Sequence, residues 1–178
     1  MAKHLICLYG GPGSGKSCCA AGLYHELKKQ DKDVELCREF VKDWVWEKRP
    51  ILQGDHIYFF GEQMRRELTL LREVDIVITD SPLLLTIEYE KAYCKSPYVM
   101  PILADKYNSI LEEMNVTVHH FFLHRTKAYN PKGRNETEDQ AEALDRAIYA
   151  TLCNRGVDPI ELVCDAYIVN NILMELEV

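Results

Sequence analysis

Residue types suited to phosphate chemistry stand near the start of the sequence, in the stretch GGPGSGKSCC at positions 10–19. The stretch fits the pattern G-x-x-x-x-G-K-[ST], with Gly10 and Gly15 as the fixed glycines, followed by Lys16 and Ser17. Backbone N–H groups can converge on a phosphate only where no Cβ is in the way, a lysine can reach the outer phosphates, and a hydroxyl can ligate Mg²⁺. The pattern therefore predicts a loop that binds the phosphates of a nucleoside triphosphate.

The residues around this loop favour the same interpretation. An apolar, strand-like run at 5–9 precedes the loop, and a helix-forming run at 18–30 follows it. The N-terminus of such a helix adds the positive end of its dipole to the anion site. A glycine turn that only joins a strand to a helix is the alternative. We expect contacts with ATP from Gly11, Gly13, Ser14, Gly15, Lys16, Ser17 and Cys18.

A second residue of the phosphate site is expected at Asp80, where the apolar run VDIVITD at 74–80 ends in an acid. In a phosphate-loop fold that acid faces Mg²⁺, directly or through water, and completes the metal site with Ser17. A turn or helix-cap role is the alternative, since Ser81 and Pro82 resemble a helix start. Ser81 stands where phosphate-loop ATPases that drive motion carry a water-orienting glutamate, so an acceptor other than water is indicated.

The segment RTKAYNPKGRN at 125–135 carries four cations and no acid, in a chain whose formal net charge is −7. Between a strand end and a capped helix, a cationic lid over about 125–136 could close over the triphosphate, neutralise charge on the transferring phosphoryl group and exclude water. A solvated loop is the alternative. Arg125 and Arg134 are the leading catalytic pair, and Lys127 and Lys132 supply the remaining charge.

Glu39 is the candidate general base. It follows the second strand-like run, at 34–37. A carboxylate at the carboxyl end of a parallel strand lies where ligands bind in open α/β sheets, and it could accept the proton of an attacking hydroxyl. The alternative is a surface glutamate that opens a helix.

Aromatic residues follow Glu39 in the sequence and could stack on the ring of an acceptor. We expect most of them in the core instead, because Ile57, Phe60 and Met64 share helical spacing. The aromatic residues concerned are Trp44, Trp46, Tyr58, Phe59 and Phe60.

Composition limits the classes of function. A net charge of −7 and a pI near 5.4 argue against a general polyanion binder. The seven cysteines form no C-x-x-C pair, which favours reduced thiols and gives no zinc spacing. No apolar stretch approaches the roughly 18 residues of a membrane helix. We therefore expect a soluble cytoplasmic protein with no membrane partner.

Alternation of strand-like and helix-like segments predicts a single α/β domain over residues 1–178, with parallel strands joined by helical crossovers. The clearest helix has a T-x-x-Q capping box at Thr137 and an apolar face. Strands are expected at 5–9, 34–37, 74–79, 116–123 and 160–164. Helices are expected at 17–30, 55–72, 84–92, 101–114, 137–154 and 165–176, with a loop at 47–54.

These motifs together resemble a known group, the small phosphate-loop kinases of phage and bacteria related to the ribosylnicotinamide kinase (NadR-like) domain. The resemblance rests on GGPGSGKS, on Glu39-Phe40-Val41-Lys42-Asp43 continuing into WVWE, on VDIVITDSPLLL, and on YNPKGRNETEDQA. It extends from Gly10 to about Asn154. Cys18 departs from the threonine or serine common in the group just after the loop serine.

The resemblance implies a five-stranded parallel sheet in the order 2-3-1-4-5, flanked by helices, with Glu39 or Asp80 beside the acceptor. It also implies phage encoding or a bacterial source, and thus a location in the host cytoplasm for a phage protein. The group is similar to phage kinases that phosphorylate a hydroxymethylated pyrimidine within DNA.

Three functions therefore remain open. The first is an ATP- and Mg²⁺-dependent kinase that acts on a hydroxyl of a nucleoside- or nucleotide-like acceptor. The second is a kinase of a modified base in phage DNA, such as 5-hydroxymethyluracil, which requires a positive channel that the net charge does not indicate. The third is a nucleotide-binding switch or ATPase with no acceptor.

Overall fold

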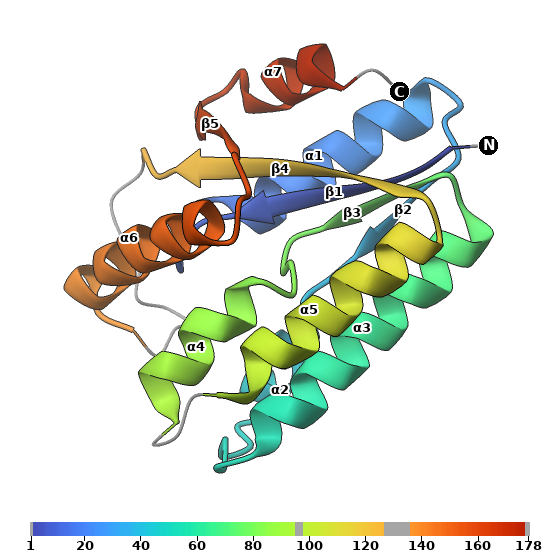
Figure 1. Ribbon diagram of the computed structural model, residues 1–178. Helices are drawn as coiled ribbons and strands as arrows, with labels where there is room; N and C mark the ends of the chain where they lie inside the picture. Colours follow the sequence, from blue (N-terminus) through green and yellow to red (C-terminus); the bar gives the residue numbers. More distant parts are fainter. Residues whose placement is uncertain (1, 95–97, 127–135, 177–178) are drawn as a thin grey trace.

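A five-stranded parallel sheet runs through the middle of the protein (Figure 1). The computed structural model describes residues 2–94, 98–126 and 136–176. The strand order is β2-β3-β1-β4-β5, which confirms the predicted fold class and order. The strands are β1 (Lys3–Tyr9), β2 (Val34–Cys37), β3 (Ile76–Thr79), β4 (Val116–His124) and β5 (Ile160–Val163).

Burial on both faces of the sheet explains why the central strands are continuous apolar runs in the sequence. A parallel sheet covered by helices on both faces has no solvent side, so its central strands need no polar alternation. All of β3 is buried, and so are the last five residues of β1, which lies between β3 and β4. Strand β5 lies at an edge of the sheet, and most of its residues are exposed.

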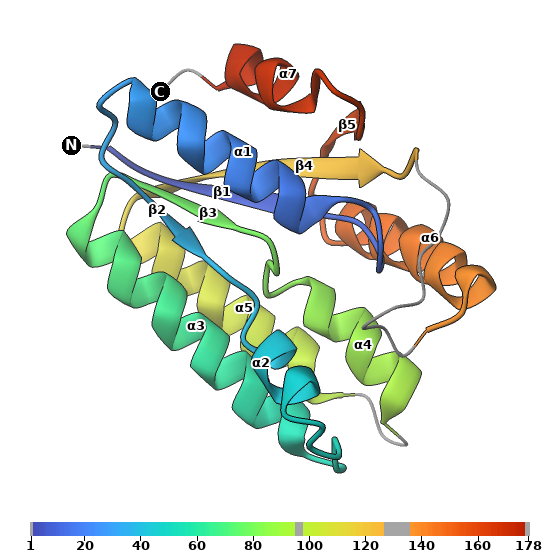
Figure 2. The same cartoon turned by 180° about the vertical axis from the view of Figure 1, so that it is seen from behind.

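Helices cover both faces of this sheet. Figures 1 and 2 show α1 and α7 on one face and α3, α4, α5 and α6 on the other. Two separate apolar clusters match these two layers. The helices are α1 (Lys16–Lys29), α2 (Val41–Trp46), α3 (Asp55–Glu73), α4 (Leu85–Tyr93), α5 (Val99–Glu113), α6 (Glu138–Asn154) and α7 (Ile168–Glu175).

The predicted elements agree closely with these bounds, and the differences are local. The short helix α2 was not expected, since the sequence shows no full turn of apolar spacing there, and none of its residues is buried. Helix α7 begins three residues later than predicted. The strand expected from Val74 begins at Ile76. The described part of the chain contains no helix long and apolar enough to cross a membrane.

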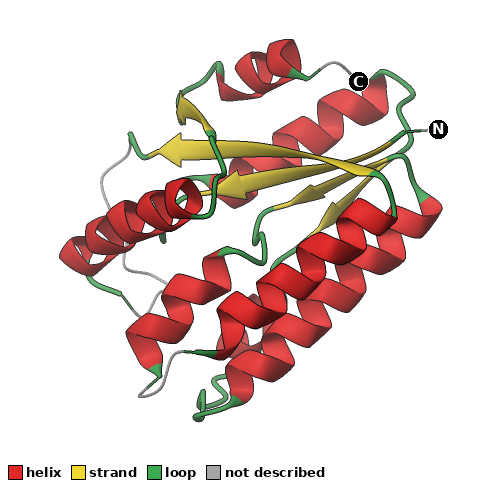
Figure 3. Ribbon diagram, in the orientation of Figure 1, coloured by secondary structure: helices red, strands yellow, loops and turns green. Residues whose placement is uncertain are grey.

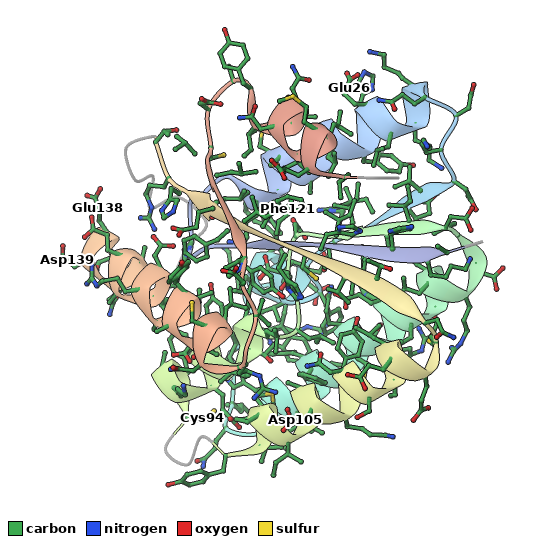
Figure 4. The ribbon with its side chains drawn as sticks, turned by 45° about the horizontal axis from the view of Figure 1, so that its top comes forward. Glu26, Cys94, Asp105, Phe121, Glu138 and Asp139 are labelled. Carbon is green, nitrogen blue, oxygen red and sulfur yellow. The ribbon has the colours of Figure 1, made fainter. Side chains whose placement is uncertain are left out.

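The predicted packing of the aromatic residues is partly wrong. Phe59 and Phe60 are buried, but Ile57 and Tyr58 are 50% and 53% exposed and Trp46 is 63% exposed. The first turn of α3 lies beyond the sheet (Figure 3) and packs beside the short helix α2, none of whose residues is buried. Figure 4 shows the general pattern, with Phe121 of β4 in the interior and Glu26, Glu138 and Asp139 at the periphery. Trp46 and Tyr58 therefore lie outside the core.

The capping box of α6 is present as predicted. The Gln140 N–H donates to Thr137 Oγ1 at 3.3 Å, and the Thr137 N–H donates to Gln140 Oε1 at 2.8 Å. These bonds satisfy two backbone donors that a helix start otherwise leaves unpaired. The predicted inner face of α6 is buried throughout, at Ala141, Leu144, Ile148 and Leu152.

Replacing the cap residue should therefore cost stability without altering the sheet. We expect Thr137→Ala to lower the free energy of unfolding by about 1 kcal/mol, because one helical N–H loses its acceptor. Urea denaturation followed by circular dichroism measures this loss. Thr137→Ser keeps the hydroxyl and is the matched control, so an equal loss in both variants would contradict the capping role.

Candidate phosphate-binding and catalytic site

The glycine-rich loop leaves β1 at Tyr9 and enters α1 at Lys16. Gly10, Gly13 and Gly15 have φ angles of +135°, +85° and +95°, a region that side chains with a Cβ rarely adopt. A Cβ on Gly10 would also lie 2.6 Å from Ser14 Oγ. The glycines therefore let the chain turn here with its backbone N–H groups clear of side chains. The N-terminus of α1 lies in the same loop.

Lys16 lies folded over the loop it belongs to. Its Nζ donates to the carbonyl oxygens of Gly10 at 2.6 Å and Gly11 at 2.9 Å, and approaches Ser14 Oγ at 3.5 Å. Burial lowers the pKa of the Lys16 ammonium, and the nearby carboxylates of Glu39, Asp80 and Asp145 act in the opposite direction. The ammonium is thus held at the loop, among acidic groups from three other segments.

Glu39 and Asp80 are neighbours although 41 positions separate them, because each follows one of two adjacent parallel strands, β2 and β3. The Glu39 N–H donates to Asp80 Oδ1 at 2.9 Å. Burial raises the pKa of the Glu39 carboxyl; Lys16 opposes this shift and Asp80 adds to it. A raised pKa makes this carboxylate a better proton acceptor.

Two predicted contact residues, Ser17 and Cys18, are exposed in the first turn of α1, at the open side of the loop. Asp80 is only 6% exposed. Mg²⁺ bound with a nucleotide takes one or two protein oxygens and completes its shell with phosphates and water. The Ser17 hydroxyl and the Asp80 carboxylate are hard oxygen donors of this kind. Within the described ranges no three His, Cys, Asp or Glu side chains form a metal site by themselves.

Asp145 is a site residue that the sequence analysis missed. Its Oδ1 accepts the Gly11 N–H, and its Oδ2 accepts from the Arg125 guanidinium. It therefore connects α6 with the phosphate loop and with the first residue of the predicted lid. The sequence signal for it was an acid directly after Leu144 and one turn after Ala141, on the apolar face of α6.

Only the ends of the predicted lid fall within the described residues. Arg125 is largely buried against Asp145, and Glu136 accepts a 2.6 Å hydrogen bond from the Tyr93 hydroxyl of α4. Lys127, Lys132 and Arg134 lie outside the described residues. The structure thus brings Arg125 to the phosphate loop, and the role of Arg134 stays a prediction.

Aromatic rings gather on the Glu39 side of the site. Phe40 makes an edge contact with Tyr58 at 5.5 Å between centroids, and Trp44 makes one with Phe59 at 5.1 Å. Burial raises the pKa of the Tyr89 phenol, and the charges of Glu39, Glu136 and Asp145 raise it further. Glu39 and Asp145 therefore act on both Tyr89 and Lys16.

Comparisons with known proteins agree with this geometry. A model of the family described as "AAA domain" matches residues 5–166. No curated protein matches the chain in sequence. Among solved structures, thymidylate kinase from Ehrlichia chaffeensis has a TM-score of 0.64 at 14% identity, and the match covers 100% of both chains.

Two further solved structures share the arrangement. The NadR protein in complex with NR has a TM-score of 0.71 at 14% identity, with 99% of this chain and 52% of that chain covered. An APS kinase from Mycobacterium tuberculosis has a TM-score of 0.56 at 14% identity, with 99% of each chain covered. The fold is that of phosphate-loop kinases, so the resemblance predicted from the motifs is confirmed for the fold.

The two hydrogen bonds of Asp145 predict a graded loss of stability. We expect Asp145→Ala to lower the free energy of unfolding by about 1–3 kcal/mol, because the Gly11 N–H and Arg125 both lose an acceptor. Asp145→Asn keeps one oxygen for Gly11 and should lose less. Urea denaturation measures both, with Glu142→Ala, an exposed acid of the same helix, as control. Equal stability of the Ala variant and this control would show that the Asp145 contacts contribute nothing.

Proposed function

The chain belongs to the AAA domain family, and from this premise we propose that it is a kinase that transfers the γ-phosphate of ATP to a hydroxyl of a nucleoside- or nucleotide-like acceptor. One observation carries the proposal. The Asp80 carboxylate accepts the Glu39 N–H at the carboxyl edge of the sheet, and the charges of Glu39 and Asp80 both act on the loop lysine Lys16. A metal-side acid, a base and a phosphate-binding cation are the groups that phosphoryl transfer to an alcohol needs.

In the proposed reaction the acceptor oxygen attacks the γ-phosphorus and the bond to the β–γ bridging oxygen breaks, which releases ADP. Glu39 takes the proton of the acceptor hydroxyl. Lys16 and the N–H groups of the loop stabilise the charge on the β- and γ-phosphates. Mg²⁺, held by Ser17 and Asp80, would neutralise phosphate charge when bound.

We further propose that the segment 125–136 acts as a lid, with Arg125 and Arg134 as its catalytic cations. The position of Arg125 beside the Gly11 N–H supports this role, since both groups can bind phosphate oxygens. Arg125 would then exchange its bond with Asp145 for a bond with the triphosphate. A closed lid excludes water, which favours the acceptor over hydrolysis.

The aromatic rings beside Glu39 support an acceptor with a planar ring. Phe40 and Trp44 follow the candidate base in the chain, and Tyr58 at the start of α3 contacts both rings. Guanidinium groups already lie over Phe40 and Trp44, which supports a role for this cluster in binding planar groups by stacking. Solved structures with this fold are a thymidylate kinase and NadR in complex with NR. The acidic groups around Lys16 and the net charge of −7 disfavour the backbone of DNA at the same place.

The identity of the acceptor can be tested directly. We expect transfer of label from γ-labelled ATP to one member of a panel of nucleosides and nucleotides, and none to a duplex that carries 5-hydroxymethyluracil. Label on the duplex alone would favour the DNA base kinase. Rapid release of phosphate without any acceptor would favour the switch or ATPase.

Lys16 should be essential to transfer but not to folding. We expect Lys16→Ala to reduce the single-turnover rate by at least about 10²-fold, because positioning and electrostatics supply most of the catalysis in phosphoryl transfer. Lys29→Ala, at the far end of the same helix, is the matched control. Circular dichroism should show the same fold in both variants. A Lys16→Ala protein with the parent rate would rule out the proposed site.

The pH dependence of transfer should report on Glu39. A base acts only when deprotonated, so the rate should fall as the pH drops through the pKa of Glu39, which lies above the usual value of 4.5. Glu39→Gln should remove this acidic limb and lower the rate by about 10²- to 10⁴-fold, with little change in ATP affinity. Single-turnover rates over a pH series that starts near the usual pKa of 4.5 and rises to neutral pH measure this limb.

Asp80→Asn is the comparison for this variant, since it should weaken the response to Mg²⁺ as well as the rate. If Glu39→Gln keeps the parent rate and its acidic limb while Asp80→Asn loses both with unchanged metal dependence, the two roles are reversed.

A further inference from the structure

A fully buried carboxylate lies beneath the site, in α3. Glu67 has no exposed surface. Its Oε1 accepts from Thr79 Oγ1 at 2.7 Å and from Gln63 Nε2 at 3.3 Å, and its Oε2 accepts from the Tyr107 hydroxyl at 2.6 Å. Most of the other side chains that line this part of the interior are apolar. Burying an acid in such a place costs free energy, and the hydrogen bonds of Glu67 to three side chains offset part of that cost.

Two hydrogen-bond partners of Glu67, Thr79 and Gln63, contact the chain next to Asp80 and Glu39. Thr79 is the last residue of β3 and immediately precedes Asp80. Gln63, which donates to Glu67 through Nε2, accepts the Phe40 N–H through Oε1 at 3.1 Å. Phe40 directly follows Glu39. One carboxylate oxygen of Glu67 thus holds the segment after β2 through Gln63 and the end of β3 through Thr79.

A third link closes this set of bonds into a ring. The Glu39 N–H donates to Asp80 Oδ1 at 2.9 Å, and the charges of both residues act on Lys16 of the phosphate loop. On the side that faces α3, Gln63 and Thr79 meet at Glu67 Oε1. Two sets of hydrogen bonds therefore join the two segments. One is the bond from Glu39 to Asp80, and the other runs through Glu67 on helix α3.

We propose that Glu67 is a positioning residue that fixes the separation and orientation of Glu39 and Asp80 through Gln63 and Thr79. This inference rests on the proposed kinase function for its effect on rate, while the coupling between the two segments stands on the geometry alone. Phosphoryl transfer needs its base and metal ligand held in place, and a displacement of about 1 Å can cost about 10²-fold in rate. In this proposal Glu67 acts only through Gln63 and Thr79.

Thr79→Val tests this role, because valine has a similar shape and lacks the hydroxyl, which donates to Glu67 and also accepts the Ser81 N–H at 3.4 Å. We expect Thr79→Val to lower the kcat of transfer by about 10-fold, with the KM for ATP changed less than about 2-fold, since the loop that holds ATP is not part of the ring. Thr79→Ser restores the hydroxyl and should restore the parent kcat. A merely structural role for Thr79 would alter the melting temperature without this division between kcat and KM.

Tyr107→Phe is the matched control. It removes a bond to the same carboxylate, but on Oε2, the oxygen that is not part of the ring. We expect it to lower the melting temperature and to leave kcat at the parent value. Equal kcat values for Thr79→Val and Tyr107→Phe would overturn the positioning role, whether both fell or both stayed at the parent value.

A measurement without turnover separates this inference from the proposed function. Hydrogen exchange by NMR reports the opening of individual amides. We expect the Glu39 and Phe40 amides to exchange about 10-fold faster in Thr79→Val, although Thr79 bonds neither amide, and to be unchanged in Tyr107→Phe. If the parent transfers phosphate to no acceptor, the proposed function fails and this exchange still decides the coupling. Unchanged exchange in Thr79→Val would overturn it.

Discussion

The hydrogen bond between the Glu39 amide and the Asp80 carboxylate joins the two segments on which the site depends. It forms because β2 and β3 are parallel neighbours, so both chains leave the sheet at the same edge. On the other side of β3, strand β1 delivers the phosphate loop to that edge as well. A change in strand order would separate these groups even with every motif intact. Ligands of open α/β sheets bind at this edge for the same topological reason.

Electrostatics at this edge depend on balance between a few ions. Lys16 lies among the carboxylates of Glu39, Asp80 and Asp145, and Arg125 is paired with the last of these. The phosphates of a nucleotide would add negative charge to this group. The arrangement therefore needs its cations close to the phosphates and its acids directed at a metal ion or a proton. The proposed division of roles between Glu39 and Asp80 follows that requirement, since it assigns the less exposed acid, Asp80, to the metal side.

Two acidic residues outside the sequence motifs, Asp145 and Glu67, make hydrogen bonds that connect the helices to the site. Asp145 follows the buried Leu144 of α6 and is itself half-buried, and Glu67 stands on the buried face of α3 beside Leu68 and Leu71. Each interrupts a helical pattern that packing alone would fill with apolar side chains. Such a break between local pattern and environment is expected where a residue serves a site. Here one acid contacts the phosphate loop directly, and the other lies beneath the two strand ends.

The sequence by itself determined the phosphate loop, the alternation of strands and helices, and the capping box of α6, because glycine conformation, apolar periodicity and local hydrogen bonds act over a few neighbouring residues. It also indicated Glu39 and Asp80 singly, as acids that follow strands. Only the tertiary structure decided that the Glu39 amide meets Asp80, that Asp145 reaches Gly11 and Arg125, and that Tyr58 remains exposed while Phe59 is buried. These contacts join residues from 20 to 134 positions apart, and no local preference encodes a partner at such a distance. They follow from which strands pair and from which helix face the sheet covers.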